Sequence, residues 1–377
     1  MTLFDVIVVG GGLSGGLTAR RCAEAGRKVL LIEKQAFVGG EKTWSFHTTD
    51  VTPAELQWLS PFVVKSWNTQ EVVFPARRRT LPTGYHAIPS SRFREVLKNT
   101  PRLEILPECE VVGCDWQTVT FASGSKMQAC QVWDARNTTP RGHRAFGYQK
   151  FVGQDIRLAQ PHGLLHPVIM DATVEQIDGF RFVYLLPWDA HTLLVEDTRY
   201  SESPHIDVEG FRGSIRSYLS DRFGDTGETL REERGCLPVP LQAAAESAPN
   251  AIGVGAGLYH PTTSYSLPFA VRTADWIAAH SKVPASDLPE RWRAFRLKQK
   301  DQEMFYVLLN RMLFAAPPAR RYRILERFYG LPLPLIERFY SARSSWRDKA
   351  RLLLWGKPPL PVGQALRGLL RNTLSHA

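Results

Sequence analysis

The sequence has 377 residues, of which 44% are hydrophobic, and this is typical of a globular protein with two domains and sizeable buried cores. Its five cysteines form no CxxC pair, which excludes the common cysteine metal sites and favours the reduced thiols of a cytosolic protein. The net charge of +10 comes from the last quarter of the chain, because residues 291–377 hold 18 Lys and Arg against 5 Asp and Glu.

The first elements in chain order predict a nucleotide-binding unit. A β-branched run over residues 4–9 predicts a buried strand, residues 13–25 a helix that ends at Gly26, and residues 28–32 a second strand. A strand, a helix and a strand in this order are typical of a parallel sheet.

Three glycines and one acid in this unit are candidate cofactor-binding residues. Gly10, Gly12 and Gly15 match the pattern GxGxxG, which permits a tight turn, close approach of a pyrophosphate and close packing of helix on strand. Glu33 ends the second strand, where its carboxylate can accept hydrogen bonds from ribose hydroxyls. The position at the start of the chain favours FAD over NAD, and the alternative is a glycine-rich turn that binds nothing.

Later segments predict a second, antiparallel sheet and a helical end. Residues 180–187 and 191–198 flank the short turn Trp-Asp-Ala and predict a hairpin. The other expected elements are helices over residues 91–99, 208–223 and 266–280, strands over 118–121, 127–133 and 251–257, and helices from residue 290 onward.

These elements predict an α/β fold of the α+β flavoprotein type. It has a Rossmann-like FAD domain with a parallel sheet, a substrate domain with an antiparallel sheet, and a helical C-terminal region. We assign residues 1–50, 75–145 and 240–285 to the FAD-binding domain, residues 51–74 and 146–239 to the substrate domain, and residues 286–377 to a helical, basic region. The charge of this region fits either a solvated helical face or contact with anionic lipid or nucleic acid.

A second glycine segment, residues 253–268, is a further candidate for cofactor contact. Its expected strand ends in glycines that include Gly257, and a small polar turn then leads into a helix that starts with a proline. Backbone N–H groups at such a helix start can face a phosphate or a flavin ring, and Thr262, Thr263 and Ser264 are the polar donors beside them. The alternative is an ordinary loop between a strand and a helix.

Two adjacent acids, Glu196 and Asp197, end the second strand of the predicted hairpin. Alternation along a strand sends their side chains to opposite faces, so they cannot form one catalytic pair. We expect one acid to take part in the reaction and the other to have a structural role. From the residues alone, a solvated strand end is the stronger alternative.

Several longer motifs resemble those of the bacterial lycopene beta-cyclases of carotenoid synthesis. The resemblance runs in order from residue 5 to about residue 361 and rests on GGEKTWSFH (39–47), FVGQ (151–154), PHGLLHPVIMDATV (161–174), RFVYLLP (181–187), LLVEDTRY (193–200), HPTTSYSLP (260–268), LNRMLF (309–314), RFYGLP (327–332) and GKPPLP (356–361). Two positions depart from that pattern: Ser264 stands where a glycine is expected, and Tyr259 where a phenylalanine is usual.

The resemblance implies a flavoprotein fold like that of the aromatic hydroxylases, with noncovalent FAD that must be reduced and NADPH as the electron donor. It implies that the substrates are lycopene and other carotenoids with ψ-ends, and that the catalytic carboxylate is Glu196. Because lycopene and β-carotene are isomers, we expect a redox-neutral, acid-initiated carbocation reaction. Reduced flavin is expected to stabilise the positive charge, with a role as transient proton donor as an alternative. Trp44, Phe46, Tyr148 and Tyr184 are candidates to face the cation, and each has a core position as its alternative.

Because such a substrate resides in a membrane, we expect the basic C-terminal region to contact lipid. Basic residues beside the apolar run 304–309 indicate an interfacial anchor on anionic lipid, and they are Lys298, Lys300, Arg311, Arg320, Arg321 and Arg323. We therefore expect a peripheral protein on the cytoplasmic face of the membrane. No recognised nucleic-acid-binding module is present, so we expect no nucleic-acid partner.

Two other functions remain as alternatives. One is a monooxygenase that uses FAD and NADPH on a lipophilic substrate, and the other is a flavin-containing protein that binds membrane surfaces without catalysis. The sequence has no HExxH and no Cys/His ligand cluster, so we expect no metal, and we also expect no covalent nucleophile.

Overall fold

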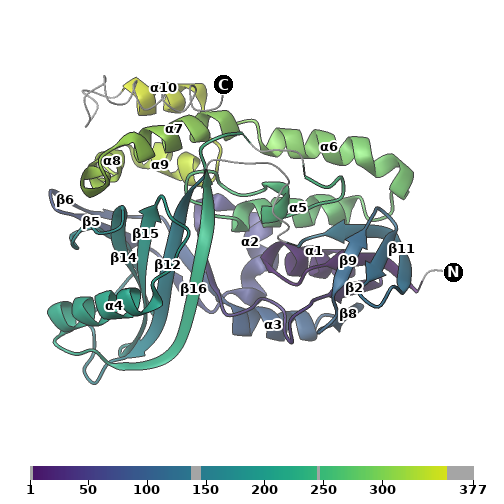
Figure 1. Cartoon of the computed structure of the whole chain (residues 1–377), viewed down its shortest axis with the longest axis horizontal. Helices are drawn as coiled ribbons and strands as arrows, with labels where there is room; N and C mark the ends of the chain where they lie inside the picture. Colours follow the sequence, from purple (N-terminus) through teal and green to yellow (C-terminus); the bar gives the residue numbers. More distant parts are fainter. Residues whose placement is uncertain (1–2, 137–145, 244–246, 355–377) are drawn as a thin grey trace.

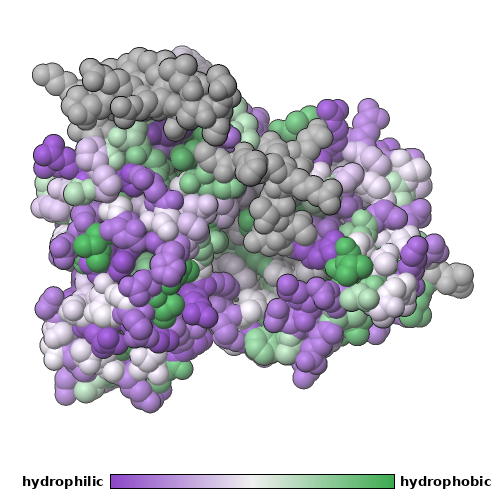
Figure 2. All heavy atoms as spheres, in the orientation of Figure 1, coloured by the Kyte–Doolittle hydropathy of each residue, from purple (hydrophilic) through white to green (hydrophobic). Residues whose placement is uncertain are grey.

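The computed structural model describes residues 3–136, 146–243 and 247–354. Figure 1 shows two main sheets side by side, with the C-terminal helices along the top of both. On the face seen in Figure 2, outside the grey atoms, hydrophilic residues dominate and hydrophobic residues form small separate groups.

The first sheet carries the predicted nucleotide-binding unit. Its six strands have the order β8-β2-β1-β11-β10-β9, of which the first four are parallel. The strands are β1 (Phe4–Val9), β2 (Val29–Ile32), β8 (Leu103–Leu106), β9 (Val111–Cys114), β10 (Thr118–Phe121) and β11 (Lys126–Asp134). Helix α1 (Leu13–Glu24) joins β1 to β2 and shares one apolar core with α5 (Leu267–Ala279), so the predicted βαβ start is confirmed.

The second sheet has seven strands and is almost entirely antiparallel. Its order is β16-β12-β15-β14-β13-β5-β6, and only β13 and β5 pair in parallel. The strands are β5 (Gln70–Phe74), β6 (Arg77–Leu81), β12 (Phe146–Arg157), β13 (Val168–Asp171), β14 (Phe180–Pro187), β15 (Thr192–Ser201) and β16 (Glu228–Pro240). Helix α4 (Val208–Phe223) packs on one face through Phe211 and Ile215, which leaves the other face for the cavity described below.

A small three-stranded sheet accompanies the two larger ones. It pairs β3 (Thr43–His47), β7 (Tyr85–Pro89) and β4 (Lys65–Trp67) in antiparallel fashion. The remaining N-terminal helices are α2 (Pro53–Leu59) and α3 (Ser90–Lys98), with 3-10 turns η1 (Thr48–Asp50) and η2 (Ser60–Phe62). Pro89 occupies the N-cap position of α3.

The C-terminal region is helical, as predicted. It contains α6 (Leu288–Gln299), α7 (Glu303–Ala315), α8 (Tyr322–Phe328), α9 (Leu333–Tyr340) and α10 (Trp346–Leu354), with turns η4 (Ala285–Asp287) and η5 (Pro318–Arg320). Buried aromatic residues such as Tyr306, Phe328 and Phe339 share a core with Phe180 and Tyr200 of the seven-stranded sheet. Within residues 3–136, 146–243 and 247–354, no helix has the length and apolarity needed to cross a bilayer.

The fold class and the C-terminal helices match the prediction, but the strand expected over residues 251–257 is wrong. Only Ala251 forms a bridge, to Asp134, and residues Val254–Ala256 form the 3-10 turn η3. Gly253 and Gly257 have φ values of 68° and 71°, and such left-handed residues break an extended run. The domain boundaries remain a prediction; β6, on the FAD side of the proposed boundary at residue 75, pairs with β5 in the seven-stranded sheet.

Candidate active site

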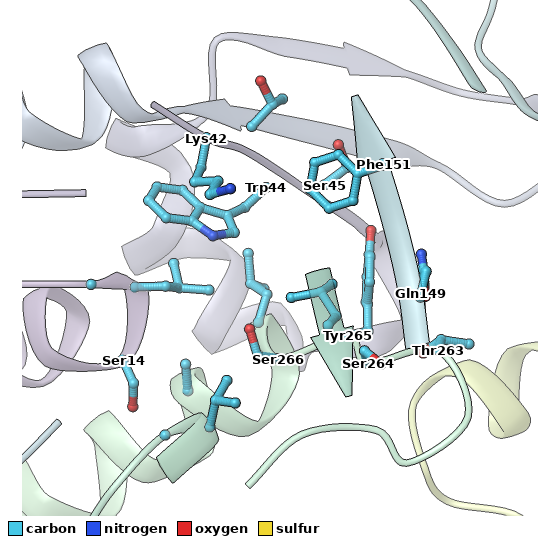
Figure 3. A pocket seen from close by; sticks show the side chains of 18 of the residues that line it. Ser14, Lys42, Trp44, Ser45, Gln149, Phe151, Thr263, Ser264, Tyr265 and Ser266 are labelled. Carbon is cyan, nitrogen blue, oxygen red and sulfur yellow. The ribbon is translucent and has the colours of Figure 1, made fainter. Parts of the chain in front are cut away.

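One cavity of about 540 Å³ joins the nucleotide-binding unit to the acidic strand. Gly12 and Glu33 line one part of it, and Glu196 and Tyr184 line another. Figure 3 shows that its walls come from segments far apart in the sequence: Ser14 in α1, Lys42 and Trp44 next to and in β3, Gln149 and Phe151 in β12, and the loop that carries Thr263, Ser264, Tyr265 and Ser266. A ligand in this space can therefore contact both predicted halves of the site.

The three predicted glycines have different roles in the turn between β1 and α1. Gly10 has a φ of 102°, and a Cβ on Gly15 would lie 1.9 Å from the carbonyl oxygen of Gly10. Only glycine at position 15 lets the helix pack this closely on the turn. Gly12 is the N-cap of α1 and lines the cavity, with nothing within 4 Å of its would-be Cβ.

Glu33 is held by two backbone groups at the edge of the cavity. Its Oε2 accepts a 2.7 Å hydrogen bond from the Gly11 amide, and its Oε1 accepts a 2.9 Å bond from the Gln35 amide. Each carboxylate oxygen can accept a further bond, so hydroxyl groups of a ribose remain possible partners. The contact between Glu33 and Gly11 was not predicted. Gly11 lies between two glycines that were predicted, Gly10 and Gly12.

Two residues that line the cavity carry a buried hydroxyl group without a partner. Ser14 Oγ and Thr263 Oγ1 have no hydrogen-bond partner among the described residues, and both residues line the cavity. Buried polar atoms are normally hydrogen-bonded, so these two fit a site that a polar ligand completes. Ser14 was not predicted; its place in the first turn of α1, beside Gly12, is the signal in the sequence.

The second glycine loop is organised by a buried histidine. His260 Nε2 contacts the carbonyl oxygen of Phe339 at 2.8 Å, and its Nδ1 accepts hydrogen bonds from the amides of Thr262 and Thr263. Burial lowers the pKa of His260 to about 4, so the ring is neutral. Gly257 and Thr262 are not among the described residues that line the cavity, and the Thr262 carbonyl instead accepts a bond from the Tyr200 hydroxyl.

Ser264 occupies a conformation that favours glycine. Its φ is 55°, in the left-handed region, and its Oγ donates a 2.8 Å hydrogen bond to the carbonyl oxygen of Pro238. This side-chain bond ties the loop to β16 and compensates for part of the backbone strain. The serine at this position therefore keeps the loop geometry that a glycine would adopt without strain.

Glu196 lies in the middle of β15, and not at a solvated strand end as the alternative had it. The strand continues to Ser201, and the Glu196 side chain lines the cavity. Its removal from bulk water, reinforced by the nearby Glu233 carboxylate, raises the pKa of Glu196 to about 8, although the Thr198 hydroxyl and Lys42 oppose this rise. A carboxyl group in this state can hold a proton at neutral pH and release it to a bound substrate.

Asp197 points to the opposite face of the same strand, as the alternation predicted. It is fully buried, and its two oxygens pair with Arg181 at 2.8 Å and Arg199 at 3.0 Å. These two guanidinium groups keep Asp197 in a buried ionic network away from the cavity. Its place in this network is structural.

Several aromatic residues also line the cavity. Tyr184 pairs with Glu196 across the sheet, and its hydroxyl donates to Tyr85, which in turn contacts the Tyr265 hydroxyl at 3.0 Å. Burial raises the pKa of Tyr184 well above its usual value, so it is neutral. Of the four aromatic residues named from the sequence, Trp44 and Tyr184 line the cavity, Phe46 is buried in the core, and Tyr148 is not among the described lining residues.

Comparison with known sequences places the chain beside one family. The family model described as "Lycopene cyclase protein" matches residues 5–367. A lycopene beta-cyclase of Pseudescherichia vulneris is 44% identical over 98% of this chain and 97% of its own length. Lycopene beta-cyclases of Pantoea ananas and of Paracoccus sp. (strain N81106 / MBIC 01143) are 40% and 39% identical, and each match covers at least 97% of both chains.

Comparison with solved structures shows the same fold at much lower identity. A flavin-dependent brominase superposes with a TM-score of 0.63 at 14% identity, covering 98% of this chain and 99% of the other. The p-nitrophenol 4-monooxygenase of Pseudomonas putida DLL-E4 gives a TM-score of 0.60 at 18% identity, covering 91% of this chain and 99% of the other. A geranylgeranyl bacteriochlorophyll reductase-like protein of Thermoplasma acidophilum gives 0.57 at 14% identity, over 97% and 95% of the chains.

Proposed function

The chain belongs to the lycopene cyclase family, and we propose that it is an isomerase that closes the ψ-ends of lycopene into β-rings, giving γ- and β-carotene. The full-length match to three lycopene beta-cyclases supports this substrate and reaction. Substrate and product are isomers, so the reaction moves a proton and no net electrons.

The single observation that carries the proposed chemistry is the position of Glu196. It is the acid of β15 that faces the cavity, while its neighbour Asp197 is held in ion pairs on the other face. With a pKa of about 8, Glu196 keeps its proton at neutral pH. It is therefore the group that we assign as the proton donor.

In the proposed reaction, Glu196 protonates the terminal double bond of the substrate. The resulting carbocation is attacked by a nearby double bond of the same molecule, and the new carbon–carbon bond closes a six-membered ring. Loss of a proton from the ring restores neutrality and leaves the β-ring double bond. The apolar wall, which includes Ile169, Met170 and Phe182, excludes water that would otherwise capture the cation.

We assign FAD to the same cavity on the basis of its polar groups. Four residues that line the cavity would hold it. They supply a carboxylate (Glu33), a helix N-cap (Gly12) and two unpartnered hydroxyl groups (Ser14 and Thr263). Gly257, Thr262 and Ser264 would shape the loop that carries Thr263. Reduced FAD, with NADPH as electron donor, supplies negative charge that stabilises a cation, which neutral oxidised flavin does not.

We further propose that the C-terminal helices contact the cytoplasmic surface of an anionic membrane. A carotenoid substrate resides in such a membrane. Four large apolar side chains are exposed there: Leu297, Met304, Trp346 and Leu353. Exposed basic residues include Lys298 of α6 and Arg347 of α10, and Arg323 is exposed on α8. The combination suits an interfacial contact in which apolar groups enter the lipid and cations meet its headgroups.

Two of the six cations named for this anchor from the sequence point elsewhere. Arg321 is 1% exposed and bonds to Glu202 and to the Phe314 carbonyl, and Arg311 donates to the Leu241 carbonyl. Tyr306 and Val307 of the apolar run 304–309 are also buried, and Phe305 and Leu309 pack against the core. The proposed contact therefore depends on α6, α10 and the first turn of α7.

An anaerobic assay tests the proposed reaction. Protein with lycopene in lipid vesicles, FAD and NADPH is incubated without oxygen, and the product is analysed by chromatography and mass spectrometry. We expect β-ring products with the mass of lycopene, and no product when the flavin is kept oxidised. A strict need for oxygen with a gain in mass would instead indicate a monooxygenase, and flavin and lipid binding without any product would indicate a binding protein.

A further inference from the structure

Gly153 separates two glutamates in one row of the seven-stranded sheet, the half-buried Glu196 and the buried Glu233. It pairs with Glu196 of β15 on one side and with Glu233 of β16 on the other. Residues in one row of a sheet point to the same face, so both acids share the face of the cavity. A Cβ at position 153 would lie 3.3 Å from Glu233 Cγ and 3.4 Å from Glu196 Cβ. Because Gly153 has no side chain, no side chain of β12 stands between the two acids in this row, and Leu194 Cδ1 also lies 3.3 Å from the position of such a Cβ.

Glu233 has the partners that an ionised carboxylate requires. It is 3% exposed, and its Oε2 accepts a 2.6 Å bond from Arg231 and a 2.9 Å bond from the Thr43 hydroxyl. Burial raises the pKa of Glu233, and Arg231 opposes that rise directly. Glu196 instead accepts a hydrogen bond from the Thr198 hydroxyl, and no guanidinium of the described residues bonds to it. Of the two carboxyl groups, we therefore assign the proton to Glu196 and the negative charge to Glu233.

Lys42 brings a positive charge to the same position. It lines the cavity, donates to the Arg234 carbonyl and lies 5.3 Å from the Phe151 ring centroid. Burial lowers the pKa of Lys42, and this change is opposed by the charge of Glu233 and by the charge that Glu196 acquires when it loses its proton. Of the other groups around Glu196, the Thr198 hydroxyl also lowers its pKa. Tyr184 is neutral, and Asp197 is offset by Arg181 and Arg199 on the opposite face.

We propose that Glu233 and Lys42 are opposed positioning residues for the proton of Glu196. The Glu233 carboxylate, held by Arg231 and Thr43 across Gly153, keeps the proton on Glu196, and the Lys42 ammonium favours its release when substrate is bound. Neither residue needs to touch the substrate for this role. The inference rests on the proposed function of Glu196 as proton donor.

The pH dependence of turnover tests this inference, because activity must fall as Glu196 loses its proton. Glu233→Gln removes a negative charge and keeps an oxygen for Thr43, so the alkaline midpoint of the turnover rate is expected about one pH unit lower than in the wild type. Lys42→Gln removes a positive charge, so its alkaline midpoint is expected to be higher. Glu232→Gln is the matched control, because Glu232 is the adjacent residue on β16 and pairs with Arg212.

The two shifts have opposite signs, so loss of packing cannot imitate both. Flavin content, measured by absorbance, shows that each variant is folded, and Lys42→Gln keeps the test available if Glu233→Gln does not fold. A Glu233→Gln profile that coincides with the wild type, or a Lys42→Gln midpoint that does not rise, would overturn the inference. Either result, together with an inactive Glu196→Gln, leaves the proposed donor intact, whereas an active Glu196→Gln removes the donor itself.

Discussion

The hydroxyl of Thr198 donates a 2.7 Å hydrogen bond to Oε1 of Glu196, two positions earlier on the same face of β15. The bond stabilises the ionised form of Glu196 and so lowers its pKa against the effect of burial. Glu196 is thus held in one orientation at the cavity wall, and the Thr198 hydroxyl lowers its proton affinity.

Replacement of this hydroxyl is expected to extend activity to higher pH. Thr198→Val keeps the branched shape and removes the hydrogen bond, so the pKa of Glu196 rises and the alkaline midpoint of turnover moves up by about half a pH unit to one unit. The measurement is a pH profile of turnover. Thr80→Val, the same change at an exposed position of β6, is the control and is expected to match the wild type. A downward shift for Thr198→Val would show that the hydroxyl does not stabilise the carboxylate.

Flavin affinity is expected to depend on Glu33. Its carboxylate orders the turn through Gly11 and Gln35 and faces the proposed cofactor. Glu33→Ala removes these charge-assisted bonds, so we expect a dissociation constant for FAD about tenfold or more higher, measured by flavin fluorescence titration. Glu104→Ala, at an exposed position of the same sheet, serves as the control. Equal affinities would place the nucleotide away from Glu33.

The strained loop residue Ser264 gives a prediction about stability. Ser264→Ala keeps the unfavourable φ and loses the bond to Pro238, so the free energy of unfolding is expected to fall by about 1 kcal/mol. Ser264→Gly loses the same bond but relieves the strain, so its loss is expected to be smaller. Denaturant titrations of both variants measure the difference. An alanine variant as stable as the glycine variant would mean that the backbone at this position is not strained.

Local patterns in the sequence were sufficient for much of this fold. The first strand, Phe4–Val9, and the helix Val208–Phe223 have the predicted bounds, because β-branched runs and helical spacing are properties of neighbouring residues. The segment 251–257 was mistaken for a strand, because an apolar run with glycines has the same pattern whether its glycines are extended or left-handed. Only the φ values of Gly253 and Gly257 distinguish the two.

The candidate site was predictable where its residues belong to one segment. Alternation separated Glu196 from Asp197, and the resemblance to a family selected Glu196. The neighbour of Glu196 was not predictable, because the row that joins positions 153, 196 and 233 is set by the register of three strands distant in the sequence. The sequence also did not indicate which of Thr262 and Thr263 lines the cavity, because this depends on the turn that His260 organises.

Lipid binding is expected to depend on the exposed tryptophan of α10. Trp346 is 74% exposed, and α10 packs beside the start of α7, where Lys349 lies over the Phe305 ring and Ser344 bonds to Gln302. Trp346→Ser is expected to weaken binding to anionic vesicles about tenfold, measured by co-sedimentation. Added salt is expected to weaken the vesicle binding of both the variant and the wild type. Val112→Ser, at an exposed position of β9, is the control. Unchanged binding for Trp346→Ser would move the membrane contact to another surface.

The turnover of Glu196→Gln with reduced FAD tests the central claim most directly. Glutamine keeps the size of the side chain and an acceptor for Thr198, but it has no acidic proton to donate. We expect normal flavin content and lycopene conversion at least about a hundredfold slower than in the wild type, within the range for removal of a general acid. Conversion at the rate of the wild type would contradict the account, because the proton would then come from another group.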